Sequence, residues 1–577
     1  MLKGQIRIEP VVPTLFSPLQ MTILKKSIAG LAACSLLTFT AIAGPLKFTG
    51  NESVESEDLY RVTVKLKEGE DGLVPDSLGQ IYQLRNIDAA KLAPASISSI
   101  LRGISELYQE RGILATRAVV TASGYKASRQ GKALEVKIIE GKVTRTRVVG
   151  AAESDEISPA QKDRVMSIAP IAVGDTISAK ALDGTVGLIN RFSRQQIRPV
   201  LVPEVGDLVL EYRVKQLDES MGTFAIDNYG ADRLGRERFT LDYTNWNSFT
   251  PDDKFHIKAL TTLEGNSNYF GADYMVPLDD IRSSRLSFNV AYSNFVAEDV
   301  GLLGAADIDF EGNSFHAGAR WEKTIWNDAG KYLDTIIGIR YLDVTQDQTS
   351  IGVPEAKTGF LLPSVGVRYS KTTPNGSLIM GTRAEMNLSS LADTASGTEL
   401  DQQGRLFAED SFVTGSIYTA YRQYLDNIFT EKNGRKHELS AFLTFNTSFG
   451  DRVPPSFLNV AGGFQTVRGY PLGIASGDSS FLVKLDYKYH FDTLDVGGGL
   501  DMSAALFSDF ATVKNEDALF FERDETLWSV GVGLDATINN DLRAATGYGF
   551  VLRENESPVQ QVEAGDGEFY FQVGYSF

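Results

Sequence analysis

This 577-residue sequence contains few residues whose types and spacing could form a catalytic or metal-binding site. Asp307, Asp309 and Glu311 form an acidic group that could attract calcium, but the rest of an EF-hand pattern is missing, which favours a solvated loop. No G-x-S-x-G motif, C-x-x-C pair or phosphate-binding loop occurs. We therefore expect no catalytic site, cofactor or metal. The four histidines are isolated in strand-like stretches, which predicts that they are structural residues of β-strands rather than metal ligands: His256, His316, His437 and His490.

The overall charge and the N-terminus indicate the class of partner and the compartment. The formal net charge of -18 argues against nucleic acid as a partner, because phosphate neutralisation needs a basic face. Residues 1–43 are predicted to be an export signal, in which two lysines precede an apolar run over residues 28–42. Ala41 and Ala43 form the expected cleavage site, so that the mature chain begins at Gly44.

Two features of this signal leave alternatives open. The signal fits best if translation begins at Met21, and the preceding residues are then either an over-extended gene start or a real extension. The only cysteine, Cys34, could end a lipoprotein box, whereas cleavage after Ala43 agrees better with an apolar run that continues past the cysteine. Cleavage after Ala43 would leave a mature chain without cysteine and therefore without disulfides.

The first part of the exported chain mixes short strands with amphipathic helices. After a short N-terminal segment over residues 44–59, we expect a small α+β module over residues 60–143 with a helix over residues 94–111. A second such module is expected over residues 144–216, with a helix over residues 179–192. The strands predicted in the two modules span residues 60–67, 116–121, 133–140, 146–149, 200–202 and 208–214.

From residue 217 to residue 577, helical patterns fade and alternation with period two takes over. Sixteen candidate strands can be counted in this region. In residues 481–491 the odd positions are apolar and aromatic, while most even positions carry lysine, aspartate or histidine. A soluble sandwich would bury the apolar face in its core, whereas a transmembrane barrel turns that face to lipid and the charges to a wet lumen.

The connection lengths favour the transmembrane barrel. Long and short connections alternate, as in an up-and-down barrel with short periplasmic turns and longer outer loops. The long ones span residues 297–310, 346–356, 389–409, 450–479, 510–524 and 554–566. The sequence thus predicts about sixteen antiparallel strands in the outer membrane of a Gram-negative bacterium, preceded by two α+β modules in the periplasm. Its last strand is aromatic and resembles the signal that the outer-membrane assembly machinery recognises: Phe569, Phe571, Val573, Tyr575 and Phe577.

The longest connection contains the run GGFQTVRGYP at residues 462–471, between the eleventh and twelfth predicted strands. Within it, Val467, Arg468, Gly469 and Tyr470 resemble the motif of the sixteen-stranded barrels preceded by POTRA modules, which move or insert proteins at outer membranes. With two modules and one barrel, the chain looks most like the two-partner secretion transporters that export haemolysins and filamentous adhesins. AIDNYGADRLGRER, RGILATRAVV and LEVKIIEGKV are also similar to segments of that family.

The resemblance also implies a contact inside the barrel. In this family the loop folds back into the lumen, and its arginine meets an aspartate of an F-x-D-x-G motif on the thirteenth strand. Phe507, Asp509 and Ala511 match this motif, with alanine in place of glycine, so the resemblance pairs Arg468 with Asp509. A charged loop in a narrow lumen needs a fixed counter-charge, and a guanidinium fork on a carboxylate gives a directional one.

The chain departs from the family in two places. Residues 44–59 are too few for the helix that often plugs the pore together with its linker, so we expect that only the 450–479 loop can obstruct the lumen. Ser193-Arg194 stand where the second module usually has Pro-Gly. The resemblance implies a pore that exports, with or without activation, a partner polypeptide such as a haemolysin or adhesin. The alternative is an assembly factor for membrane proteins or surface lipoproteins. A passive porin would not need the modules, and no catalytic constellation supports an enzyme.

Overall fold

The computed structural model describes residues 45–152, 156–204, 207–297, 310–348, 353–426, 428, 435–496, 498–556 and 561–577. The predicted cleavage site at Ala41, Ala43 and Gly44 lies outside these residues, as do Asp307 and Asp309 of the acidic group. The chain divides into two compact units, one ending at Gly141 and the other beginning at Lys142. Among the helices that the structure describes, none is long and apolar enough to cross a membrane.

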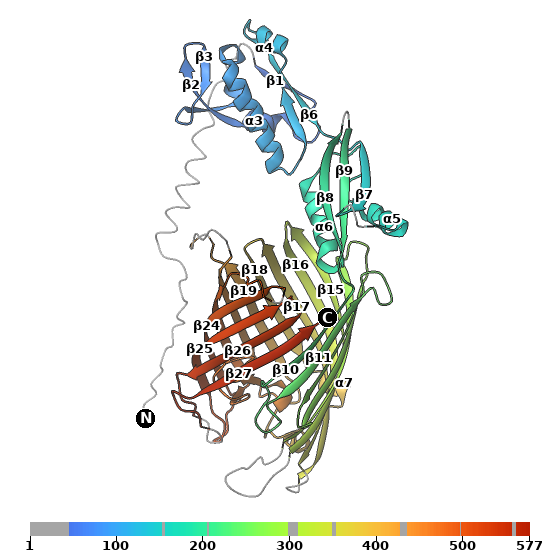
Figure 1. The fold of residues 1–577 in the computed structure, drawn as a ribbon, viewed down its shortest axis with the longest axis vertical. Coiled ribbons are helices and arrows are strands. Elements are labelled where there is room, and N and C mark those ends of the chain that lie inside the picture. Colours follow the sequence, from blue (N-terminus) through green and yellow to red (C-terminus); the bar gives the residue numbers. More distant parts are fainter. Residues whose placement is uncertain are drawn as a thin grey trace, which may run out of the picture. The chain divides into compact units, whose positions relative to one another are not determined.

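The described part of the first unit is a small α+β module (Figure 1). Its longest helix, α3 (Pro94–Glu110), begins with a proline. Proline is tolerated there because a backbone N–H group in the first turn would have no acceptor within the helix. Ile100, Ile104 and Tyr108 of this helix are buried in the module's core. The other elements are β1 (Leu46–Thr49), α2 (Ser56–Arg61), β2 (Thr63–Gly69), β3 (Gly72–Pro75), β4 (Gln80–Gln83), η1 (Leu84–Asn86), η2 (Ala89–Lys91), β5 (Thr116–Val119), α4 (Ala122–Ser128) and β6 (Leu134–Glu140).

The first module begins earlier than the sequence analysis predicted. Strand β1 pairs in parallel with β6, and Leu46 and Phe48 are buried in the same core as the helix. The separate segment over residues 44–59 and the module boundary at Tyr60 were therefore wrong. A four-residue strand is too short for its alternation to be seen in the sequence, since only two of its side chains face the core.

The second unit starts with another α+β module. Its sheet has the order β7-β9-β8, in which β7 (Arg145–Gly150) runs parallel to β9 (Asp207–Gln216) and β8 (Gln195–Glu204) runs antiparallel to it. Helix α6 (Ala179–Phe192) spans the predicted residues. The sequence analysis missed α5 (Pro159–Ile168), which begins with a capping box but has only one buried side chain to mark a periodic pattern.

Sixteen strands of the described residues close into an antiparallel barrel, with β27 paired to β10 (Figure 1). This confirms the predicted strand number. Closure leaves no free sheet edge, so the backbone groups of every strand have partners without water. The strands are β10 (Ser220–Asp227), β11 (Arg238–Trp246), β12 (Lys254–Thr262), β13 (Ser267–Pro277), β14 (Ser284–Ala297), β15 (Phe310–Asp328), β16 (Lys331–Gln348), β17 (Val353–Thr373), β18 (Gly376–Met386), β19 (Val413–Tyr424), β20 (His437–Thr447), β23 (Ser479–His490), β24 (Leu500–Lys514), β25 (Glu525–Ile538), β26 (Leu542–Val551) and β27 (Gly567–Ser576).

Large apolar side chains cover the outer face of the barrel. On β27, Phe569, Val573 and Tyr575 are each about half exposed, and Phe224 of the adjoining β10 is similarly exposed. The alternate positions of these strands point inward, and on β23 they carry lysine and aspartate. An apolar outer band around a polar interior is the pattern of a barrel surrounded by lipid.

The two ends of the barrel differ in their connections. At the turn end, tight turns such as residues 329–330 and 539–541 join the strands. The loop end carries long connections, among them those over residues 387–412, 448–478 and 515–524. The predicted long connection over residues 346–356 was wrong, because β16 and β17 continue through most of it as a hairpin. The predicted long connection over residues 297–310 lies almost wholly outside the described residues.

Candidate functional site

The 448–478 connection folds back against the inner face of β24, β25 and β26. Val467 and Tyr470 are fully buried, in an apolar cluster with Ala511, Leu527 and Val551 of those strands. These three strand residues alternate with outward-facing ones, which places the cluster on the lumen side. The loop also contains a small ribbon of β21 (Asn459–Ala461) and β22 (Ala475–Gly477), which carries the 462–474 turn region.

The structure brings Arg468 and Asp509 together. The Nε and Nη2 atoms of Arg468 donate hydrogen bonds to the two carboxylate oxygens of Asp509 at 2.6 and 2.7 Å. The backbone N–H of Arg468 donates a third bond to the same carboxylate at 3.0 Å. The side chain of Asp509 is fully buried and that of Arg468 is 12% exposed. Two parallel bonds from one guanidinium fix the direction of the contact as well as the charge.

Two further residues complete the arginine site. The Nη1 atom of Arg468 donates to Asp486 Oδ1 at 2.8 Å, and the guanidinium lies 3.7 Å from the centre of the Phe507 ring. The sequence analysis gave Phe507 through the strand motif but missed Asp486. A signal existed, because Asp486 lies on the charged face of the 481–491 pattern. Its position opposite Phe507 follows only from the register of β23 with β24.

The beginning of the 462–471 run is held by other contacts. Lys484 Nζ donates to the backbone carbonyl oxygens of Phe464 and Gln465 at 2.8 and 3.1 Å. The Phe464 ring stacks on that of Tyr229, in the connection after β10, with ring centres 3.8 Å apart. Lys484 is also opposite Asp509 in the sheet register. The loop is thus fixed to both the twelfth and the first strand regions of the barrel.

Glycine allows the turn to approach the wall closely. Gly469 has a φ of 101°, a backbone conformation that L side chains rarely adopt. Its N–H donates to the hydroxyl of Tyr570 on β27 at 2.8 Å. The hydroxyl of the adjacent Tyr470 accepts a bond from the backbone N–H of Trp528 at 3.1 Å. Every member of the 467–470 run therefore makes a specific contact with the wall.

The remaining predicted site residues lie in two places. Ala511, which stands where the family motif has glycine, is 2% exposed, and its methyl group is part of the apolar cluster with Val467 and Tyr470 rather than in conflict with the loop. The aromatic residues predicted as an assembly signal alternate along the outer face of β27. The ring of the terminal Phe577 stacks on Phe224 at 5.2 Å.

The four histidines all lie in barrel strands. His256 points to the lumen between Asp242 and Asp273, with each ring nitrogen 3.1 Å from one carboxylate. Within the described part of the chain, no group of three histidine, cysteine or acidic side chains is arranged to hold a metal ion. Glu311 lies on β15, whereas its acidic neighbours in the sequence are outside the described residues.

The end of helix α6 reaches the inner wall at the turn end. Arg191 donates from Nη1 and Nη2 to the two carboxylate oxygens of Asp334 at 2.9 and 2.8 Å. Asp334 is fully buried and also accepts a bond from Arg368 at 3.0 Å. Next to Arg191, the ring of Phe192 lies 3.6 Å from the guanidinium of Arg285. These contacts tie the second module to the strands that line the lumen.

The comparisons with known proteins agree on one group. The sequence matches the family described as haemolysin secretion/activation protein ShlB/FhaC/HecB over residues 207–536. It is 20% identical over 472 residues to the heme/hemopexin transporter protein HuxB of Haemophilus influenzae, which covers 80% of this chain and 78% of that protein. The structure resembles CdiB from Escherichia coli, with a TM-score of 0.67, 14% identity and coverage of 98% and 100%. It also resembles CdiB from Acinetobacter baumannii, with a TM-score of 0.60 and 14% identity, over 97% of this chain and 98% of that one. At such identities the structural likeness shows a common fold.

Proposed function

Because the chain belongs to the family of haemolysin secretion/activation proteins, it is an outer-membrane transporter of two-partner secretion, and we propose that an extended partner polypeptide passes through its lumen. The observation that carries this proposal is the 448–478 loop, which is folded into the lumen and tethered there by Arg468. The loop is held by the bonds of Arg468 and by the apolar packing of Val467 and Tyr470, and these contacts can be released without breaking the pairing of the strands. The barrel itself is held by closed backbone pairing that does not involve the loop.

The tether has a strength that suits reversible movement. Exposed ion pairs contribute roughly 0–1 kcal/mol, whereas breaking a well-buried one costs about 3–5 kcal/mol. The contact of Arg468 with Asp509 lies between these cases, because Asp509 is fully buried but the arginine keeps some exposure in a confined lumen. The pair therefore sets the position of the loop more than the stability of the barrel.

The orientation of the chain follows from the same proposal. The turn end of the barrel and both modules face the periplasm, and the loop end faces outward, since outer-membrane barrels have short periplasmic turns. The sheets of both modules have edge strands whose unpaired backbone groups can add an extended segment of the partner. The partner is a secreted polypeptide of the haemolysin or filamentous adhesin kind, exported with or without activation.

Two other partners serve the transporter itself. The outward aromatic residues of β27 favour recognition by the outer-membrane assembly machinery while the barrel is inserted. The apolar outer face, about half exposed at residues such as Phe569 and Val573, binds membrane lipid in the finished barrel.

Removal of the tethered loop tests the proposal. We expect a variant lacking residues 462–474 to assemble as a heat-modifiable barrel, to conduct more in planar bilayers, and to lose export of a co-expressed partner. The control is Phe520→Ser, which changes a side chain that is 89% exposed in the 515–524 connection and leaves its backbone intact. Unchanged conductance in the loop variant, or normal export without the loop, would contradict the proposed role of the loop.

A further inference from the structure

A second ion pair closes the neck of the tethered loop, and it comes from a different connection. We propose that Arg405, through Asp478, is a positioning residue that holds both ends of the 448–478 loop and so limits how far the Arg468 turn can move. The importance of this contact for export rests on the proposed function, whereas its effect on the position of the loop does not. The neck is defined here as Val453, Asp478 and the groups that join them.

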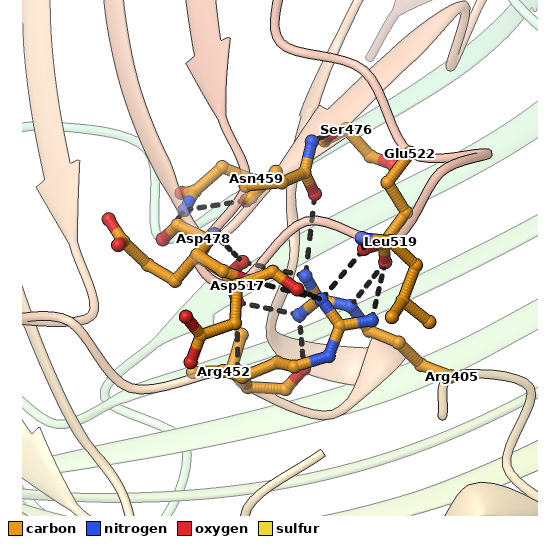
Figure 2. A network of polar contacts seen from close by, with 12 residues as sticks. Arg405, Arg452, Asn459, Ser476, Asp478, Asp517, Leu519 and Glu522 are labelled. Carbon is orange, nitrogen blue, oxygen red and sulfur yellow. Dashed lines mark hydrogen bonds and ion pairs between the residues drawn. The ribbon is translucent and has the colours of Figure 1, made fainter. Parts of the chain in front are cut away.

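The ion pair at the neck is bidentate and buried (Figure 2). The Nη1 and Nη2 atoms of Arg405 donate to the two carboxylate oxygens of Asp478 at 2.6 Å each. The side chain of Arg405 is 4% exposed and that of Asp478 is fully buried. The two parallel bonds hold the pair in one geometry. Loss of either partner would leave a buried charge without compensation.

The same groups join the start of the loop to its end. Arg405 Nη1 also donates to the carbonyl oxygen of Val453 at 2.6 Å, and the backbone N–H of Val453 donates to Asp478 at 2.8 Å. Val453 follows β20 shortly after that strand ends, and Asp478 immediately precedes β23. One guanidinium and one carboxylate therefore close the base from which the β21–β22 ribbon and the Arg468 turn extend.

A third connection completes the network. Glu522 accepts from Arg405 Nε at 3.0 Å and from Arg452 Nη2 at 2.8 Å. Burial alone would raise the pKa of the Glu522 carboxyl, but the hydrogen bonds and charges of the two arginines hold the pKa below its ordinary value. Figure 2 shows Arg405, Arg452, Asp478 and Glu522 in one network, in which ion pairs join the two guanidinium groups to the carboxylates of Asp478 and Glu522.

Arg405 is itself held by a fixed support. The 387–412 connection that carries it packs Leu400 and Phe412 against Phe360 and Leu362. Both β17 residues are buried and alternate with the outward-facing Val365, so they face the lumen. The expectation that only the 450–479 loop could occupy the lumen was therefore wrong, because the 387–412 connection lies there too. Val453 of the tethered loop belongs to the same apolar cluster, so this connection holds the start of the loop by packing as well as through Arg405.

The two tethers have different consequences for the loop. If Arg468 alone releases Asp509, the closed neck keeps the β21–β22 ribbon in place, and only the end of the loop moves. If the neck opens as well, the whole ribbon can swing away from β24 to β26. Arg405 thus decides between a small and a large displacement of the loop.

The test measures the position of the loop without any partner polypeptide. Val467→Cys puts a reporter at a fully buried site, and its reaction with a charged maleimide is followed in the purified full-length protein. We expect Arg405→Met to increase the labelling rate at least about tenfold, because a broken buried pair loosens the neck. Arg405→Lys should rescue part of the effect, since it keeps the charge but lacks the fork. Lys514→Met is the control, as the side chain of this lysine is 62% exposed and its ion pair with the Glu516 carboxylate involves neither Arg405 nor Asp478.

A neutral variant guards against misfolding. Arg405→Met combined with Asp478→Asn removes both buried charges, and we expect it to remain heat-modifiable, to label fast, and to conduct more in planar bilayers. Parental labelling in a folded Arg405→Met or double variant would overturn the proposal. Loss of heat-modifiability in every neck variant would also overturn it, by showing that the network supports the barrel rather than the loop. Fast labelling without any defect in export would support the role of Arg405 in positioning the loop but would refute the role of the loop in export.

Discussion

Gly469 of the loop and Gly549 of β26 approach each other so closely that a methyl group on Gly549 would lie 2.5 Å from the amide nitrogen of Gly469. No real side-chain carbon occupies such a position, and the atoms it would meet are backbone, which cannot rotate away. The close contact lets the N–H of Gly469 reach Tyr570 and sets the depth at which the neighbouring Arg468 enters the wall. The glycine on the strand is therefore as necessary to the site as the one in the loop motif.

We expect Gly549→Ala to displace the loop while the barrel still assembles. Overpacking of this kind costs typically about 1–3 kcal/mol, and lifting the loop relieves it more easily than moving a paired strand. Secretion of a co-expressed partner should fall and labelling of a cysteine at Val467 should rise. Gly533→Ala is the matched control, because a methyl group on this inward-facing glycine of β25 would meet its nearest neighbour at an ordinary 3.4 Å. Equal secretion by the two variants would show that the close contact is not needed.

The pair at the centre of the site gives a second prediction. Arg468→Ala and Asp509→Ala should both assemble normally and lose most secretion, and the double variant should be no worse than either, because one interaction cannot be removed twice. Asp486→Asn should have a smaller effect, since Asp486 accepts one bond from Arg468 whereas Asp509 accepts three. Secretion and heat-modifiability are measured for all four variants. Simple addition of the two single defects would contradict the pairing.

Much of the fold could be predicted because its pattern is local. The alternation of residues 481–491 gave both faces of β23, and the three- and four-residue spacing of residues 94–111 gave α3. The errors arose where the pattern was short or the partner distant. Strand β1 has only Leu46 and Phe48 to mark it, and the hairpin of β16 and β17 extends through a stretch that looks like a loop.

The site was predictable in part for a different reason. The pairing of Arg468 with Asp509 was predicted from a family resemblance. The roles of Asp486 and Gly549 depend on how neighbouring strands are registered, which only the closed sheet of the structure shows. Arg405 could not be found in advance. Its contact with Asp478 joins two connections that are separated by two strands, and no local periodicity relates them.

The first module should lose stability in acid through Glu140. This carboxylate is 8% exposed and accepts bonds from the backbone of Ser53 and the hydroxyl of Tyr108, both at 2.8 Å. Burial would raise the pKa of Glu140, but these bonds hold the pKa below its ordinary value of 4.5. A lowered pKa in the folded state means that the stabilisation is fully present above 4.5 and is lost as the pH falls through the lowered value.

Glu140→Gln should therefore destabilise the module by about 1–3 kcal/mol at neutral pH and make its stability less sensitive to acid. Hydrogen exchange in residues 46–61 of the full chain, corrected for the intrinsic rate at each pH, measures the effect. The control is Glu106→Gln, an exposed glutamate on the same helix as Tyr108. If the parent keeps the same protection on both sides of 4.5, the carboxylate does not stabilise the module in this way.

Removal of both modules should separate folding from export. The boundary used for the deletion is residue 45 rather than residue 60, because β1 belongs to the first sheet. A barrel that begins near Ser220 loses Arg191, but Asp334 keeps its bond from Arg368 at 3.0 Å and its bond from Thr324 at 2.6 Å. The buried carboxylate thus remains paired, and closure of β27 on β10 is unaffected.

We therefore expect the chain without residues 45–216 to be a heat-modifiable barrel that exports nothing, since the sheet edges proposed to capture the partner are gone. Arg191→Ala, which keeps both modules, is the matched variant. It removes two hydrogen bonds to Asp334 and should lower export without abolishing it. Normal secretion by the truncated barrel would show that the partner enters the lumen without capture by the modules. Failure of the truncated chain to form a barrel would show that α6 supports the wall as well as the entrance.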